Sequence, residues 1–264
     1  SMIVFNVIYA ILLRRGKPQM EKRILRFQQA ITLQLDCLRR GSGVEPRHLR
    51  YLQRKLRRVK NLSAFDQALQ ALRQGSRSGA IDTYLTQIQP AVLYLSLIYL
   101  KRETTQAAYF SYFLARHMAQ RHMAIQSLQE VLLSYMTKDN LYCRVNALQS
   151  LCAFGDMEHI LTALRLQEQG SVPLHEKILT EALLAFTGSH EKLAALLWEH
   201  LNDFSPHTQL AIMNYIRFQT GSYTVQMLPL MEDTSRDKEV RLAAIRYFGR
   251  YPYGPALEKL LAFA

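Results

Sequence analysis

Glycine and proline are scarce in this sequence of 264 residues, which holds 11 glycines and 8 prolines while 49 % of its residues are apolar. Disordered and collagen-like chains are rich in glycine or proline and poor in apolar side chains. The composition therefore excludes both classes. It predicts a folded, helix-rich chain with enough apolar residues for a continuous core.

Cysteine is also scarce. The three cysteines, Cys37, Cys143 and Cys152, are an odd number without the Cys-x-x-Cys spacing of zinc and redox sites. This excludes a disulfide framework and predicts reduced thiols in a cytosolic setting. Cys152 stands among apolar neighbours, which predicts a buried structural thiol.

Signatures of catalysis are absent as well. The sequence has no G-x-x-x-x-G-K-[ST] loop, no G-x-G-x-x-G and no H-E-x-x-H. His117 and His122 are five residues apart, about 140° around a helix, so we interpret them as surface or capping residues. The loop from Gly75 to Gly79 lacks the central serine of a nucleophile elbow. We therefore expect no catalytic residue, no metal, no cofactor and no small-molecule substrate.

Acidic residues are few in the N-terminal third. Residues 1–80 hold 17 Lys and Arg against 4 Asp and Glu, whereas residues 81–264 hold 16 against 17, and the whole chain carries a net charge of +12. An excess of this kind predicts an acidic partner for the N-terminal segment. The partner is either a layer of anionic lipid headgroups or a nucleic acid.

Long apolar runs are lacking too. Ile3 to Leu13 is apolar apart from Asn6, but eleven helical residues extend only about 16 Å, against about 30 Å for the bilayer core. Ser1 is typical of a residue left by tag removal, so one interpretation is a membrane anchor completed upstream. The other is a helix that packs on the rest of the chain. Cations directly after the run predict a cytoplasmic location for the remainder of the chain.

Residues 46–60 form the most basic stretch, a predicted helix with an apolar stripe at Leu49, Leu52, Leu56 and Val59. Such a helix is typical of a contact with an anionic membrane surface or a membrane protein, although its cations also suit an outer, solvated helix. The predicted anionic-partner site consists of Arg14, Arg15, Lys17, Arg47, Arg50, Arg54, Lys55, Arg57, Arg58 and Lys60.

The pattern divides the chain into three segments: an apolar helix and basic break over 1–18, a basic helical segment over 19–78, and helical repeats over 79–264. Gly16 and Pro18 predict the end of the first helix. Ser63 predicts the start of another, and residues 75–79 a flexible joint. Pro90 and the dense apolar stretch 91–100 predict a fully buried helix that starts at the proline. Another helix is expected from Ala119 to Tyr135.

Four glycines recur at a constant step of 33 residues: Gly155, Gly188, Gly221 and Gly254. Apolar columns keep the same step, as in Leu164, Leu197, Leu230 and Phe263. A fixed period of this size predicts stacked helix pairs, with the glycine in the turn of each pair. The pairs are expected at about 139–168, 172–202, 205–232 and 236–263.

Two of these units, Asp139 to Asp156 and Asp237 to Arg250, resemble HEAT repeats. The resemblance lies in an acidic start, an adjoining valine and arginine, small residues such as Ala147 and Ala244, and a glycine at the turn. It covers about residues 104–263. It implies an all-α, right-handed α-α superhelix of stacked antiparallel helix pairs, a solenoid whose second helices line the partner-binding side.

Arg165, Trp198 and Met231 occupy one column of the predicted second helices and are residue types enriched at interface hot spots. They are our candidates for binding a protein partner, with a core position as the other interpretation of Trp198. The sequence therefore favours a non-catalytic cytoplasmic scaffold or adaptor, associated with a membrane through its N-terminus. The alternative is a nucleic-acid-binding HEAT-like protein, since HEAT-like solenoids that act as DNA glycosylases exist.

Overall fold

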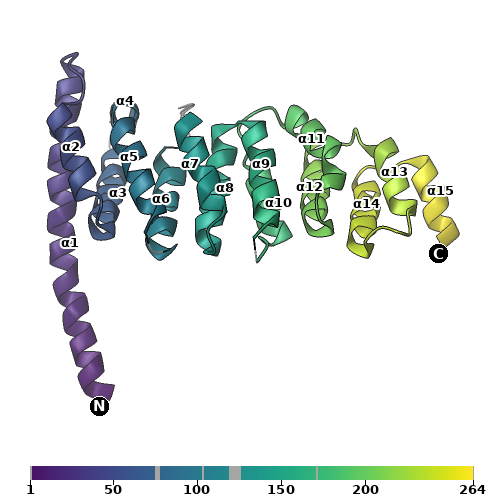
Figure 1. Cartoon of the computed structure of the whole chain (residues 1–264), viewed down its shortest axis with the longest axis horizontal. Coiled ribbons are helices and arrows are strands. Elements are labelled where there is room, and N and C mark those ends of the chain that lie inside the picture. The colour runs from purple at the N-terminus through teal and green to yellow at the C-terminus, as the bar shows by residue number, and fades with distance from the viewer. Residues whose placement is uncertain (1, 75–77, 103, 119–125, 171, 264) are drawn as a thin grey trace. The chain divides into compact units, whose positions relative to one another are not determined.

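The chain is all-helical wherever the computed structural model describes it, over residues 2–74, 78–102, 104–118, 126–170 and 172–263, and these ranges contain no strand. For residues 2–16, 78, 104, 126, 262 and 263 the description covers the backbone alone. The predicted all-α class is confirmed for this part of the chain (Figure 1).

The chain forms two compact units, residues 1–123 (unit 1) and residues 124–264 (unit 2). Most of the predicted joint at 75–79 lies outside the described residues. The helices on either side of it, α3 and α4, contact each other and belong to the same unit.

Unit 1 is built around its long first helix. The bounds are α1 (Met2–Arg39), α2 (Pro46–Lys55), α3 (Val59–Gln74), α4 (Ser78–Gln87), α5 (Gln89–Leu100) and α6 (Thr104–His117). Helix α1 packs on α3 and α4, α2 packs on α5, and α6 packs on α3 and α5. Phe27, Ile31 and Leu35 of α1 are buried together with Phe65 of α3, whose ring meets that of Phe27 edge-on at 5.5 Å.

The predicted helix end at Gly16 and Pro18 is wrong, because α1 continues through both residues. A proline inside a helix removes one backbone donor, whereas ending the helix would leave several donors and acceptors without intrahelical partners. The N-terminal half of α1 extends beyond the other helices of unit 1 (Figure 1). Among the described residues, no helix has both the length and the apolar character needed to span a membrane.

Three further expectations in unit 1 need correction. The basic helix ends at Lys55 instead of Lys60, and α3 begins at Val59, four residues before Ser63. Helix α5 begins at the predicted Pro90 region but is not fully buried, since Leu97 is 51 % exposed. Its length and apolar content indicated burial on all sides, but neighbouring helices cover only part of its circumference.

Unit 1 also contains a buried polar cluster that the sequence did not reveal. The Asp66 carboxylate lies 2.6 Å from His117 Nε2 and accepts hydrogen bonds from Gln70 at 2.8 Å and the Tyr109 hydroxyl at 3.2 Å. His117 is therefore a core residue instead of a surface or capping one. Burial lowers the pKa of His117; burial alone would raise that of Asp66, but the hydrogen bonds outweigh it and lower the pKa.

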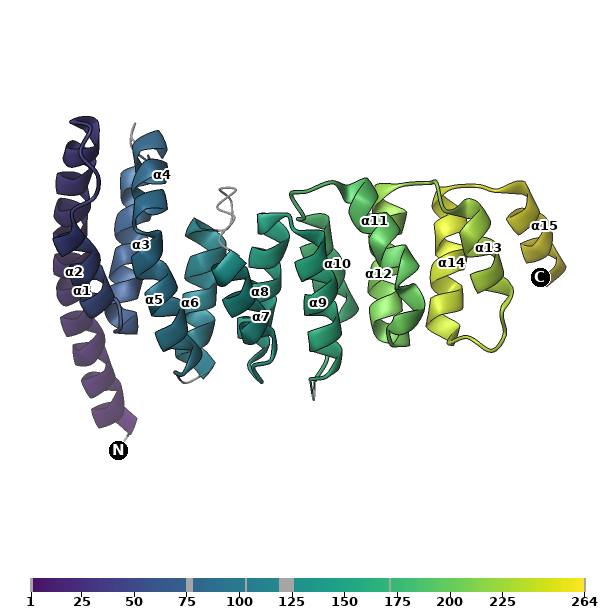
Figure 2. The same cartoon turned by 45° about the horizontal axis from the view of Figure 1, so that its top comes forward.

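In its described residues, unit 2 consists of nine helices, all much shorter than α1. Figure 2 labels them α7 to α15. Their bounds are α7 (Gln126–Met136), α8 (Leu141–Phe154), α9 (Met157–Glu168), α10 (Glu176–Leu184), α11 (His190–Glu199), α12 (Pro206–Gln219), α13 (Thr224–Glu232), α14 (Lys238–Arg250) and α15 (Gly254–Phe263), with a 3₁₀ turn at Leu201–Asp203. The helix expected from Ala119 begins at Gln126 in the described residues, since residues 119–125 lie outside them.

Each of the four units expected from the 33-residue step contains two helices: α8 and α9, α10 and α11, α12 and α13, and α14 and α15. Helices α8 and α9 pack on each other, whereas α11 packs on α12 and α13 packs on α14. The first helices of successive pairs pack on one another, α8 on α10, α10 on α12 and α12 on α14. Helices α7, α9 and α11 form a second such series. The apolar columns at the constant step supply the buried side of these contacts, as Leu164, Leu197 and Leu230 show.

Gly155, Gly188 and Gly221 lie between the helices of a pair, whereas Gly254 is the first residue of α15, and the reasons for glycine differ among them. Gly155 ends α8 in the left-handed region, with a φ of 75°. A Cβ on Gly188 would lie 2.7 Å from the carbonyl oxygen of Gly155, and one on Gly221 would meet the Tyr251 ring at 2.7 Å. A Cβ on Gly254 meets nothing within 4 Å. The step therefore marks equivalent turns, and close packing requires glycine at only some of them.

Candidate functional site

Helix α2 presents the basic stretch and is held to unit 1 along one side. Leu52 and Leu56 are buried, while Leu49 and Val59 are half-buried. Near the start of α2, His48 Nε2 lies 2.7 Å from the buried Tyr84 hydroxyl. Burial lowers the pKa of His48 to about 4, so this histidine is neutral at pH 7. Helix α2 is thus held to unit 1 by its apolar side, and the neutral His48 adds no charge to it.

The turn after α2 is fixed by two side chains. The Tyr99 hydroxyl donates a hydrogen bond to the Leu56 carbonyl at 2.7 Å, and Asn61 Nδ2 donates one to the Lys55 carbonyl at 2.9 Å. The backbone that carries Arg57 and Arg58 is therefore ordered by contacts with α5 and α3. Cations on such a turn lose little backbone entropy on binding a partner.

All seven cations of residues 47–60 are exposed, and in the described part of the chain none of them pairs with a carboxylate. We call them the basic face: Arg47, Arg50, Arg54, Lys55, Arg57, Arg58 and Lys60. Of the other predicted anionic-partner residues, Lys17 is exposed, whereas the side chains of Arg14 and Arg15 lie outside the described ones.

Aromatic and apolar side chains border the basic face. The Arg57 guanidinium lies 5.4 Å from the centre of the Tyr94 ring and donates a hydrogen bond to its hydroxyl. Tyr94 and Leu97, one turn apart on α5, are 37 % and 51 % exposed. Tyr51 is half-buried, and its ring lies 6.0 Å from those of both Phe27 and His48. Its ring is thus packed within unit 1 instead of presented for stacking.

The three residues predicted to bind a protein partner do not form one exposed column. Arg165 is exposed and pairs with Asp203 at 3.3 Å. Trp198 is half-buried, with its ring 5.1 Å from that of Tyr223. Met231 is only 1 % exposed, so its selection as a partner-binding residue is wrong. Equal spacing places residues at equivalent helical positions, but the packing of each pair decides how deeply each side chain lies.

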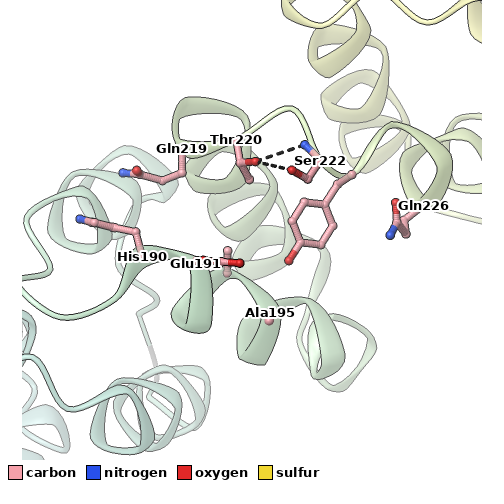
Figure 3. A pocket seen from close by; sticks show the side chains of 9 residues that line it. His190, Glu191, Ala195, Gln219, Thr220, Ser222 and Gln226 are labelled. Atoms are coloured by element: carbon pink, nitrogen blue, oxygen red, sulfur yellow. Dashed lines mark hydrogen bonds between the residues drawn. The ribbon is translucent and has the colours of Figure 1, made fainter.

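Next to Tyr223 lies an open pocket of about 520 Å³ between α11, the end of α12 and the start of α13. Figure 3 shows Thr220 hydrogen-bonded to Ser222 on one wall of the pocket. His190 and Glu191 also line the pocket, together with neutral polar side chains. His190 Nδ1 is 2.9 Å from the Tyr215 hydroxyl. Across the described residues no group of His, Cys, Asp and Glu is arranged to hold a metal. We assign no chemistry to this pocket.

Sequence reasoning missed a cluster on the first helices of unit 2. Phe218 is 45 % exposed, and the guanidinium groups of Arg217 and Arg250 lie 5.1 Å and 5.4 Å from its ring centre. Burial, followed by the charges of Arg246 and Arg250, lowers the pKa of Arg217. Arg217 and Arg250 are themselves one 33-residue step apart, and so are Phe218 and Tyr251. The same periodicity that predicted the pairs could therefore have found this cluster.

Comparison of the chain with protein-family models, with curated proteins and with solved structures finds no match. The geometry of the chain itself must therefore support any function assigned to it.

Proposed function

We propose that this chain is a non-catalytic scaffold that binds the anionic surface of a membrane through the basic face of unit 1 and a protein partner through unit 2. The observation that carries this proposal is the exposure of all seven cations of the basic face without a carboxylate partner in the described residues. A helix that only faces solvent does not need so many positive side chains, whereas an anionic surface attracts them.

The energy of such an attraction is sufficient for reversible binding. Each Lys or Arg close to an anionic leaflet contributes about 1 kcal/mol, so half of the basic face would contribute about 3 to 4 kcal/mol. Tyr94 and Leu97 beside the cations add apolar area that suits the headgroup boundary. A charge cluster with a small apolar margin is typical of peripheral membrane binding.

For unit 2 we propose the HEAT-like, right-handed α-solenoid that the sequence resembles. Its support is the repeated helix pair, with first helices packed on first helices through α8, α10, α12 and α14. Repeats that each contact their neighbours bury a shared core and leave surfaces of successive pairs available for a partner. Arg165, Trp198 and the Phe218 cluster are the exposed or half-buried positions from which such contacts would start.

Vesicle flotation tests the membrane part. We expect the chain to float with vesicles that contain anionic lipid and to stay behind with neutral ones. The triple variant R47Q/R50Q/R54Q removes one stripe of α2 and should weaken binding about 100-fold, since three cations contribute about 3 kcal/mol. A matched control, K177Q/K192Q/K238Q, removes three exposed cations from unit 2 and should bind as the parent does.

Equal weakening by the two triple variants would contradict a role for the basic face, because only total charge would then matter. The rival function is tested in parallel by a gel shift with duplex DNA at two salt concentrations. A shift that disappears steeply with salt, without flotation, would replace the membrane by a nucleic acid.

A further inference from the structure

A pocket of about 580 Å³ lies at the edge of the basic face, between three elements of unit 1. Arg23 of α1 forms one wall, and Arg58 with the first residues of α3 forms the second. Residues Thr105, Gln106 and Tyr109 of α6 complete it. Pockets of this size hold small ligands or the headgroups of larger ones.

The charged side chains among the described residues that line this pocket have one sign. They are three cations, Arg23, Arg58 and Lys60, and none of these described residues is an aspartate or a glutamate. The buried acid behind it, Asp66, already accepts hydrogen bonds from His117, Gln70 and Tyr109. Three like charges around an open, concave space raise the local potential and favour an anion there.

Hydrogen bonds made by the lining residues hold the walls of the pocket in place. The Arg58 carbonyl accepts hydrogen bonds from the amides of Asn61 at 2.8 Å and Leu62 at 3.0 Å, and Asn61 is tied to Lys55 through its side chain. Tyr109 is oriented by its hydrogen bond to Asp66. Only the three long cationic side chains need to adjust to a ligand, so binding costs little ordering of the backbone.

We propose that this pocket binds a phosphate monoester carried by a small polar group. A phosphate monoester has nearly two negative charges and three terminal oxygens, which match two guanidinium groups and an ammonium better than a single carboxylate does. The volume leaves room for the ring or chain that bears the phosphate. The inference rests on the proposed function in one respect, because it makes binding at the basic face selective for a headgroup.

The phosphate has two possible sources, a lipid headgroup or a free phosphate ester. Two sets of vesicles with equal surface charge test the lipid headgroup. One set carries phosphatidylserine and the other phosphatidylinositol monophosphate. We expect the parent chain to prefer the second set by about tenfold, the effect of one added hydrogen bond to a charged group. R23Q/R58Q/K60Q should lose this preference, whereas R47Q/R50Q/R54Q should weaken binding to both sets and keep it.

Calorimetry with soluble inositol monophosphate and with inorganic phosphate addresses the second source. Binding that R23Q/R58Q/K60Q abolishes, with no flotation of any vesicle, would support the pocket and refute the membrane proposal. Flotation without headgroup preference, together with no heat from either soluble phosphate, would refute the pocket and leave the membrane proposal standing. Circular dichroism melting of each variant checks that these exposed or half-buried substitutions leave the fold intact.

Discussion

In both units neighbouring helices pack on one another, but the two units differ sharply in charge. Residues 1–123 hold 21 Lys and Arg against 6 Asp and Glu, whereas residues 124–264 hold 12 against 15. Both bury an apolar core between neighbouring helices. Because a helical core forms with either balance of charge, the excess in unit 1 is not required for folding, and its exposure at the basic face supports the proposed role in binding.

The units also differ in the polar groups that they bury. In unit 1, Asp66, His117 and His48 are buried, and their pKa values are all lowered. In unit 2, Asp156, Asp203 and Asp233 also have lowered pKa values, but none of them belongs to the buried core. Because the buried aspartate and histidines with lowered pKa values lie in unit 1, unit 1 should be the more sensitive to acid.

The largest expected contrast is between two aspartates. Asp66→Ala removes an acceptor shared by the buried His117 and the half-buried Gln70 and Tyr109, and should destabilise unit 1 by about 3 to 5 kcal/mol, as the loss of one member of a buried polar network does. Asp203→Ala removes exposed contacts with Arg165 and His200 in unit 2 and should leave stability almost unchanged. Urea unfolding monitored by circular dichroism measures both. Equal losses would show that the buried cluster is not a major source of stability.

Acid should loosen unit 1 before unit 2. The pKa of His48 falls from its ordinary value of 6.5 to about 4 on folding, so between these pH values the unfolded state binds more protons and stability falls as pH falls. This contributes about 3 kcal/mol, fully present above pH 6.5 and lost toward pH 4. Burial lowers the pKa of His117 too, with the same sign.

Hydrogen exchange with mass spectrometry, corrected for the intrinsic rate, reports each unit separately. Peptides of α2 and α3 should lose protection between pH 7 and pH 4.5, while those of α10 and α12 keep it. Trp198, the single tryptophan, gives an independent fluorescence signal from unit 2. As the pH is lowered, a change in Trp198 fluorescence at a higher pH than the loss of protection in α2 would contradict the expected order of acid unfolding of the two units.

A smaller effect separates two members of the glycine series within unit 2. Gly188→Ala would place a methyl group 2.5 Å from the Phe186 ring and 2.7 Å from the Gly155 carbonyl oxygen, and should destabilise unit 2 by about 1 to 3 kcal/mol. Gly254→Ala meets nothing within 4 Å at the start of α15 and should be neutral or slightly stabilising. Thermal melting compares the two, and equal shifts would mean that close packing does not distinguish these turns.

Local patterns in the sequence predicted much of this fold. The 33-residue step placed the four helix pairs, and Pro90 marked the start of α5, because both signals depend on residues close together in the chain or on exact repetition. Contacts between distant segments were not predictable in this way. Asp66 and His117 are 51 residues apart, and neither has a neighbour that indicates its partner.

The candidate site was predictable in composition but not in shape. The basic stretch could be recognised because its charges are consecutive, yet the helix boundary inside it, at Lys55 and Val59, depends on hydrogen bonds from Tyr99 and Asn61. The pocket beside it needs Arg23 from α1 and Tyr109 from α6, which only the packing of unit 1 brings together. Met231 is the converse case. The sequence placed it on a second helix, where it lies, but did not predict that its side chain is buried.

The most direct measurement is the salt dependence of vesicle flotation. The parent chain should bind vesicles rich in phosphatidylserine at about 0.1 M salt and be largely released at about 1 M, where the Debye length falls from about 10 Å to about 3 Å. R47Q/R50Q/R54Q should show a shallower dependence than K177Q/K192Q/K238Q. A parent chain that stays unbound at low salt, or a basic-face variant with an unchanged salt dependence, would contradict binding of an anionic membrane through the basic face.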